Sequence, residues 1–250
     1  MALRAIKGVE SITGNCYSRT FVIGKDKGWF NISSIQDKHY LKVDISLPNI
    51  EKLATILSNI ERMFDINADT TTIQTQLVRC GVPEDKVVTG LRIPGVWDTF
   101  EAGCRAILGQ QISVKAAVTL LSQLTKELGE TQGEKLYFPI AAAIANSQLG
   151  FLKMPQSRKQ TLRLLAKHHL NLVGSSDSPD TQDASVDTWL NIKGIGPWTV
   201  AYAKMRGQSC PDIWLNTDLI IKKQMAKIKI ETELARPWRS YLTLQLWSMT

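Results

Sequence analysis

Residues 190–225 constrain the fold of this 250-residue chain more than any other segment. Their pattern predicts a helix, a tight turn that contains Gly194 and Gly196, and a second helix that starts at Pro197. Proline fits the first position of a helix because the N–H that it lacks would have no partner there. The two glycines carry no Cβ atom, so another backbone can approach the turn closely. The turn and the helix start behind it can therefore bind a phosphate group through backbone N–H groups and the positive end of the helix dipole.

Several motifs accompany this turn. They are residues 198–202 at the start of the second helix, Asp218 followed by 219–222, residues 237–241 before Trp247, and the upstream run 105–113. In this combination the chain resembles the helix-hairpin-helix DNA glycosylases and, among them, the DNA-3-methyladenine glycosylase II family, over nearly its whole length. Glycosylases with lyase activity carry a catalytic lysine where this sequence has Trp198. The resemblance therefore implies a monofunctional enzyme that removes alkylated bases from double-stranded DNA.

The amino-terminal part of the chain predicts a small lobe of strands and one helix. Short runs of apolar and alternating residues predict strands over 19–24, 28–35 and 39–47, with a turn at 25–27. Asn49 can cap a helix whose apolar side chains over 50–64 fall on one stripe. Members of the family usually have a leading segment before the equivalent of Val9, so the resemblance leaves open part of the sheet edge and any pocket residue that this segment supplies.

From residue 100 onwards the pattern predicts helices almost throughout. One helix ends at Gly109, and Ser113 can cap the next, whose apolar residues recur at helical spacing. Further helical patterns cover 140–145 and 159–168, and a polar run at 174–179 predicts a loop. The expected fold class is α+β, with a small sheet-and-helix lobe over 1–75 and a mostly helical domain with the hairpin over 99–210. The resemblance implies that 76–98 and 211–250 form a second helical lobe.

The composition favours a polyanionic partner. Lysine and arginine number 30 and aspartate and glutamate 23, for a formal net charge of +7, although many basic proteins bind no nucleic acid. No apolar run is long enough to span a bilayer and no signal-peptide core is present, so a cytoplasmic protein without a membrane partner is expected. The cysteines and histidines lack the spacing of zinc or iron–sulfur ligands. We predict no metal site and no required cofactor, and we expect a monomer.

Asp218 is the predicted catalytic residue. Cleavage of an N-glycosidic bond develops positive charge on the sugar, which a carboxylate beneath the anomeric carbon can stabilise while it orients or deprotonates water. The same aspartate can cap a helix over 219–227, a common role for this residue, and the two roles are compatible. Asn216 stands two residues earlier, where the family often has proline. The resemblance favours catalysis, and Asn216 is expected to loosen the turn without removing the carboxylate.

Three aromatic residues, Trp198, Tyr202 and Trp247, are the predicted base pocket. Alkylated purines such as 3-methyladenine carry positive charge, and electron-rich ring faces attract cations. Such a base is already a good leaving group, which agrees with the absence of a histidine near Asp218. Aromatic residues at helical spacing usually pack in the core, so the pocket assignment depends on the resemblance.

Two backbone segments are predicted to contact DNA. The first is the glycine turn, with Gly194, Ile195 and Gly196, which the resemblance implies can also hold a monovalent cation. The second is the break between the first two core helices, with Gln110, Gln111 and Ile112. A flipped nucleotide leaves a gap in the duplex, and the resemblance implies that a side chain from this break fills it. Gln111 and Ile112 are both candidates for that side chain, and an ordinary interhelical turn is the alternative.

The sequence therefore predicts an enzyme that flips an alkylated purine and hydrolyses its N-glycosidic bond without cutting the strand. The first alternative is a non-catalytic helix-hairpin-helix module that binds damaged DNA, which the absence of base release would favour. The second is an oxidised-base glycosylase with lyase activity. Trp198 argues against the second alternative, because Schiff-base chemistry needs an amine nucleophile at that position.

Overall fold

The computed structural model describes residues 1–35, 38, 40–173 and 186–249. By its contacts the chain divides into two compact units: unit 1 comprises residues 1–57 and 104–177, and unit 2 comprises residues 58–103 and 178–250. Both segments of the predicted second helical lobe, 76–98 and 211–250, belong to unit 2, whereas 99–210 is divided between the units. The three-part division stays a prediction, and the loop predicted at 174–179 lies outside the described residues.

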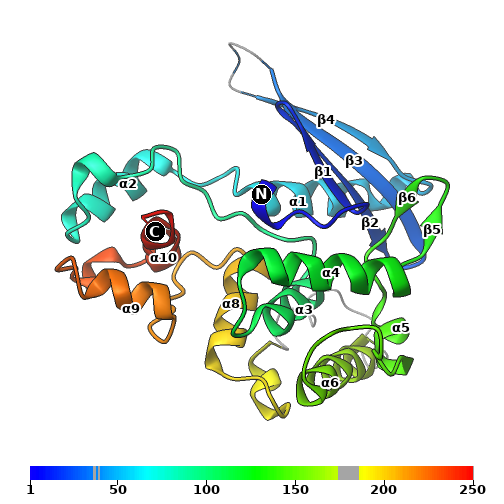
Figure 1. Cartoon of the computed structure of the whole chain (residues 1–250). Coiled ribbons are helices and arrows are strands. Elements are labelled where there is room, and N and C mark those ends of the chain that lie inside the picture. The colour runs from blue at the N-terminus through cyan, green and yellow to red at the C-terminus, as the bar shows by residue number, and fades with distance from the viewer. Residues whose placement is uncertain (36–37, 39, 174–185, 250) are drawn as a thin grey trace. The chain divides into compact units, whose positions relative to one another are not determined.

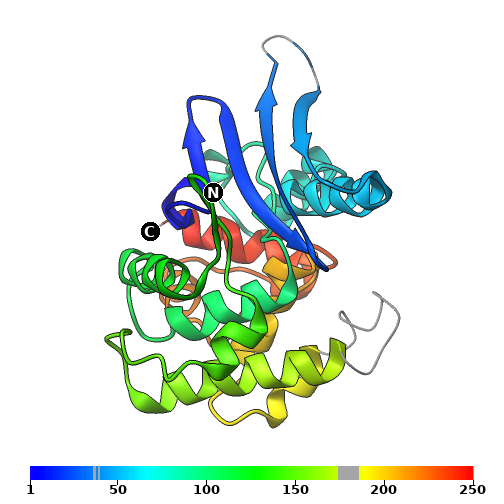
Figure 2. The same cartoon turned by 90° about the vertical axis from the view of Figure 1, so that its right-hand side faces the viewer.

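Unit 1 contains a four-stranded antiparallel sheet whose strands lie side by side in chain order (Figure 1). They are β1 (Glu10–Thr13), β2 (Cys16–Ile23), β3 (Asp26–Ser34) and β4 (Leu41–Ser46). The second view shows the hairpins β1–β2 and β3–β4 (Figure 2). The strands predicted at 19–24, 28–35 and 39–47 correspond to β2, β3 and β4. The pattern misses β1, because only Glu10 of its four residues is buried and no alternation marks it.

The turn between β2 and β3 begins one residue earlier than the predicted turn at 25–27. Ile23 pairs with Asp26, which leaves a two-residue loop of Gly24 and Lys25. Gly24 has a φ of +62°, in the left-handed region that glycine enters without a steric penalty. Because the length of a hairpin loop sets the pairing of its strands, this loop fixes which side chains of the sheet face the core.

The remaining elements of unit 1 are mostly helical. They are the 3₁₀ helices η1 (Ala2–Arg4) and η2 (Ile50–Lys52), the helices α4 (Val114–Leu128), α5 (Ala141–Asn146) and α6 (Gln156–Val173), and the hairpin β5 (Thr131–Gln132)–β6 (Lys135–Leu136). The predicted caps are confirmed: Asn49 Oδ1 accepts from the N–H of Glu51 at 3.0 Å, and Ser113 Oγ from that of Ala116 at 3.2 Å. No described helix is both long and apolar enough to span a bilayer.

Two helices begin in one unit and end in the other: α1 (Leu53–Phe64) and α3 (Thr99–Gly109). The stripe predicted over 50–64 is confirmed in part: Ile56, Ile60 and Met63 are fully buried, whereas Ile50 and Leu57 are 71% and 39% exposed. The first turn of the helix predicted from Asn49 is η2, and α1 follows it directly. The mostly helical part that follows the sheet confirms the predicted α+β class.

Unit 2 is helical throughout its described elements. They are α2 (Thr70–Arg79), η3 (Glu84–Lys86), η4 (Val186–Asn191), α8 (Pro197–Gly207), α9 (Leu219–Met225), η5 (Thr232–Ala235) and α10 (Arg239–Ser248). The helix expected before the glycine turn is the short 3₁₀ helix η4. The helix expected over 219–227 is α9, which ends two residues earlier than predicted.

Helix α10 is held to the segment before α3 by two polar side chains. Tyr241 donates its hydroxyl to Asp65 Oδ2 at 2.7 Å. Burial and this carboxylate raise the pKa of Tyr241 far above its ordinary value, so the phenol stays a donor. Gln245 donates to the carbonyl of Lys86 at 2.8 Å and accepts from the N–H of Val88 at 2.9 Å. Tyr241 thus holds the first turn of α10, and Gln245 holds the last turn, which carries Trp247.

Candidate active site

Asp218 lies at the amino-terminal end of α9 and caps this helix. Its Oδ1 accepts hydrogen bonds from the backbone N–H groups of Ile220, at 2.9 Å, and Ile221, at 3.2 Å. Its own N–H donates to the carbonyl of Leu215 at 3.0 Å, which closes the turn before the helix. The predicted capping role is thus confirmed. The side chain is half-buried, and the cap uses one of its two carboxylate oxygens.

Two indole N–H groups from other helices also donate to this carboxylate. Trp198 Nε1, in the first turn of α8, lies 3.2 Å from Asp218 Oδ2, and Trp247 Nε1, near the end of α10, lies 3.2 Å from Oδ1. From the described residues, Oδ1 accepts three hydrogen bonds and Oδ2 one. Oδ2 therefore has more acceptor capacity for a water molecule or a sugar. The structure brings the predicted catalytic carboxylate together with two predicted pocket residues.

Trp198, Tyr202 and Arg206 form a column along one face of α8, at intervals of four residues. The rings of Trp198 and Tyr202 stack with centroids 5.2 Å apart, and Arg206 Cζ lies 5.8 Å from the centroid of the Tyr202 ring. Tyr202 and Arg206 are buried, whereas Trp198 is half-buried. The Tyr202 ring thus packs against the indole of Trp198. Direct contact between Tyr202 and a base stays a prediction. The sequence interpretation missed Arg206, although its spacing from Tyr202 indicates it.

The glycine turn links η4 to α8. The N–H of Ile195 donates to the carbonyl of Ile192 at 3.0 Å, and Gly194 has a φ of +93°, a conformation that favours glycine. Gly196 occupies the capping position of α8 and Pro197 follows it, and the first turn of this helix contains no acidic residue. The positive end of the dipole is therefore available for an anion. Ile195 is buried, and the contact of this turn with DNA stays a prediction.

The family resemblance implies that backbone carbonyl groups of the glycine turn can hold a monovalent cation, while no metal site built from side chains is predicted. Within the described ranges, no group of three or more His, Cys, Asp or Glu side chains could hold a metal ion. The cation at the turn stays a prediction, and its test is a change in DNA affinity between potassium and lithium salts at equal ionic strength.

The loop between α3 and α4 belongs to unit 1 and confirms the predicted helix break. Gln111 has a φ of +58°, which is uncommon for a residue other than glycine and often marks a functional loop. Gln111 is exposed, Ile112 is 37% exposed, and Gln110 is half-buried. Gln111 and Ile112 can therefore both reach solvent, and the choice between them as the side chain that fills a gap in DNA stays open.

Comparison with known proteins places the chain among DNA repair enzymes. Residues 1–98 match the model of the AlkA N-terminal domain. The chain is 31% identical over 260 residues to DNA-3-methyladenine glycosylase 2 of Escherichia coli (strain K12), with 99% of this chain and 90% of that protein covered. It is 27% identical to the DNA-3-methyladenine glycosylase of Bacillus subtilis (strain 168), with 94% and 86% covered.

Solved structures share the fold at lower sequence identity. The 3-methyladenine DNA-glycosylase from Archaeoglobus fulgidus aligns with a TM-score of 0.75 at 12% identity, over 99% of this chain and 91% of that one. The 8-oxoguanine glycosylase/lyase of Clostridium acetobutylicum, in complex with double-stranded DNA, aligns with a TM-score of 0.67 at 16% identity, over 96% and 86%. At such low identity the likeness shows the fold, and the chemistry depends on the site residues.

Proposed function

This chain belongs to the DNA-3-methyladenine glycosylase II family, and we propose that it removes alkylated purines from double-stranded DNA by hydrolysing the N-glycosidic bond. The position of Asp218 carries this proposal, because two indole N–H groups and the start of α9 hold its carboxylate in one orientation. Two relatives that align over most of their length are named as DNA-3-methyladenine glycosylases, which supports DNA as the partner.

The arrangement suits a reaction in which the base leaves with the electrons of the broken bond. As the bond between C1′ and the base nitrogen breaks, positive charge develops on the sugar, and the carboxylate of Asp218 stabilises it. A water molecule then bonds to C1′ and loses a proton, for which Oδ2 has acceptor capacity. The electron pair neutralises the cationic base, so the base leaves without a general acid.

Trp198 and Trp247 give the site a preference for cationic bases. Both side chains are half-buried, and an indole face attracts a positive charge more strongly than other aromatic rings do. In 3-methyladenine and 7-methylguanine nucleotides the base is positively charged, whereas normal purines are neutral. We therefore propose alkylated purines, chiefly 3-methyladenine, as substrates.

The absence of strand cleavage is part of the proposal. A lyase forms a Schiff base and needs an amine nucleophile, and Trp198 stands where glycosylases with lyase activity carry their catalytic lysine. The fold does not decide this point, since one structural neighbour is titled a glycosylase/lyase. The proposal also includes two further points. The enzyme acts as a cytoplasmic monomer without a required cofactor, and it binds DNA phosphate at Gly194, Ile195 and Gly196.

The test is release of methylated purines from alkylated duplex DNA in a single turnover. We expect free base to appear with first-order kinetics and the strand to stay intact until alkali or heat cleaves it at the abasic site. Borohydride should trap no covalent adduct between protein and DNA. Binding to alkylated DNA without base release would favour the non-catalytic module, and a trapped adduct would favour a lyase.

Replacement of Trp247 by phenylalanine should lower the single-turnover rate of base release by roughly 10- to 100-fold. Phenylalanine keeps an aromatic ring but removes the N–H that donates to Asp218 Oδ1, and a hydrogen bond to a charged group contributes about 1.5–3 kcal/mol. Trp238→Phe, at the opposite end of α10, is the matched control. Equal rates in the two variants would show that the indole N–H does not support the reaction.

A further inference from the structure

The carboxyl-terminal end of α8 is fixed against its neighbours within unit 2. Arg62 donates to the carbonyl groups of Gly207 and Val96, the latter at 3.0 Å. The N–H of Val96 in turn donates to the carbonyl of Arg206 at 2.9 Å. A Cβ atom on Gly207 would lie only 2.9 Å from Thr99 Cα, so this end of α8 packs directly on the start of α3. The backbone that carries Arg206 therefore has little freedom to move.

The side chain of Arg206 is the buried end of the column on α8. Arg206 is 3% exposed, and its Cζ lies 5.8 Å from the centroid of the Tyr202 ring. This distance is within the range of a cation–π contact, which is stronger where water is excluded. Tyr202 is 4% exposed, and its ring stacks on the half-buried indole of Trp198. The column thus begins at a fixed cation and ends at a ring that solvent can reach.

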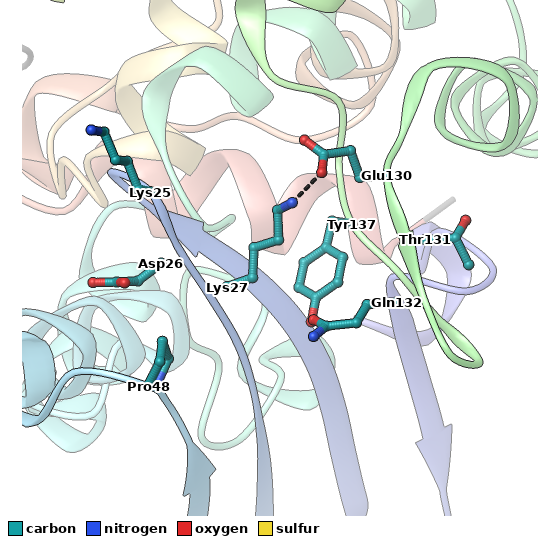
Figure 3. Close-up of a pocket in the computed structure, with 8 residues that line it drawn as sticks. All are labelled: Lys25, Asp26, Lys27, Pro48, Glu130, Thr131, Gln132 and Tyr137. Carbon is teal, nitrogen blue, oxygen red and sulfur yellow. Dashed lines mark hydrogen bonds and ion pairs between the residues drawn. The ribbon is translucent and has the colours of Figure 1, made fainter.

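A similar contact in unit 1 lacks this confinement. Lys27 Nζ lies 5.9 Å from the centroid of the Tyr137 ring, and both residues line a hollow of about 360 Å³ (Figure 3). The Lys27 side chain is 29% exposed and forms an ion pair with Glu130 (Figure 3). Lys27 can therefore change its rotamer and keep its charge in water, whereas the buried guanidinium of Arg206 stays where its packing places it.

We infer that Arg206 is a positioning residue for base release, an inference that rests on the proposed function. The Trp198 indole has two roles in the site: its N–H donates to Asp218 Oδ2 at 3.2 Å, and its face attracts a cationic base. The hydrogen bond fixes the direction of the N–H but not the rotation of the ring about it. The plane of the indole is therefore set by the stack on Tyr202, and Arg206 holds the Tyr202 ring from its other neighbour along the helix.

Replacement of Arg206 by methionine should lower the single-turnover rate of base release by roughly 5- to 30-fold, the factor that corresponds to a desolvated cation–π contact. Methionine fills much of the same space and removes the cation. Lys27→Met, which removes the cation from Tyr137, is the matched control and should keep the normal rate. Affinity for a duplex with a tetrahydrofuran abasic-site analogue should be unchanged in both variants. At saturating enzyme a smaller folded fraction lowers the amount of active protein but not the rate constant.

A double-mutant cycle distinguishes positioning from a merely structural role. Trp198→Phe removes the N–H that donates to Asp218, and in that background Arg206→Met should lower the rate by less than about twofold, because coupled residues do not act additively. If Arg206→Met does not fold, Arg206→Lys, which keeps a cation but not the planar group, replaces it in the cycle. A normal rate for the Arg206 variant, or two effects that simply multiply, overturns the inference.

Near-ultraviolet circular dichroism gives a readout that needs no base release, because it reports the fixed packing of aromatic side chains. The signal of the stacked Trp198 and Tyr202 rings should weaken in Arg206→Met and in Trp198→Phe, and Lys27→Met should leave it unchanged. An unaltered spectrum in Arg206→Met would contradict the inference even if the protein is active. Absence of base release by the unaltered protein would contradict the proposed function, whereas the spectral change would still show that Arg206 orders the two rings.

Discussion

Replacement of Asp218 by asparagine should abolish most base release while leaving the fold and the DNA affinity nearly unchanged. Asparagine can still cap α9 and accept an indole hydrogen bond, since it is as good a capping residue as aspartate. It carries no negative charge to stabilise the sugar cation and cannot take a proton from water. We expect the single-turnover rate to fall by about 10²- to 10⁴-fold, measured with methylated duplex at saturating enzyme.

The matched control for this variant is Asp69→Asn. Asp69 caps α2 in the same manner, with Oδ1 accepting from the N–H of Thr72 at 3.2 Å. Both variants should unfold at nearly the same temperature as the unaltered protein, and only Asp218→Asn should lose activity. If Asp218→Asn releases base at the normal rate, this carboxylate has no catalytic role and Asp218 is simply a helix cap.

Replacement of Glu10 by glutamine should destabilise the fold by about 3 kcal/mol or more, because the removal of one partner from a buried ion pair leaves uncompensated charge. Glu10 Oε2 accepts from Arg105 at 2.6 Å and from the N–H of Ile6 at 2.9 Å. Its Oε1 accepts from the hydroxyl of Tyr17 at 2.7 Å and from Arg19 at 3.2 Å. Both arginines are buried. We expect urea unfolding at pH 7 to show the loss.

The same carboxylate should make the stability of the protein depend on pH. Burial alone would raise the pKa of Glu10, but the guanidinium groups of Arg105 and Arg19 outweigh burial and lower it from 4.5 to about 2. Because folding lowers this pKa, the ionised Glu10 carboxylate stabilises the folded state fully above pH 4.5, and this stabilisation is lost as the pH falls towards 2. The difference in stability between the unaltered protein and Glu10→Gln should therefore shrink as the pH falls from 4.5 towards 2.

An exposed ion pair of the same sheet supplies the control for Glu10. Lys42 Nζ lies 3.1 Å from Asp44 Oδ2, and both side chains are more than half exposed. Asp44→Asn should change the stability by less than about 1 kcal/mol, because solvent and salt screen such a pair. A similar small effect for Glu10→Gln would show that the buried cluster does not stabilise unit 1.

Local features of the chain could be predicted from sequence because their physics involves neighbours along the chain. Asn49 and Ser113 cap helices with their own side chains, and Pro197 marks the start of α8. Each of these depends on residues within about one helical turn. The strand β1 was not predicted because its residues show no alternating pattern. Its extended conformation depends on pairing with β2.

The sequence by itself determined the helix caps, the glycine turn and the identity of Asp218 as the distinctive carboxylate. Only the tertiary structure decided which oxygen of that carboxylate keeps acceptor capacity. Trp198 and Trp247 stand 20 and 29 residues from Asp218 along the chain, and periodicity says nothing about where their N–H groups point. The tertiary structure also decided that Tyr202 stacks on Trp198 and that Glu10 binds Arg105, 95 residues away. Such contacts arise when helices and strands pack against each other, which no local pattern encodes.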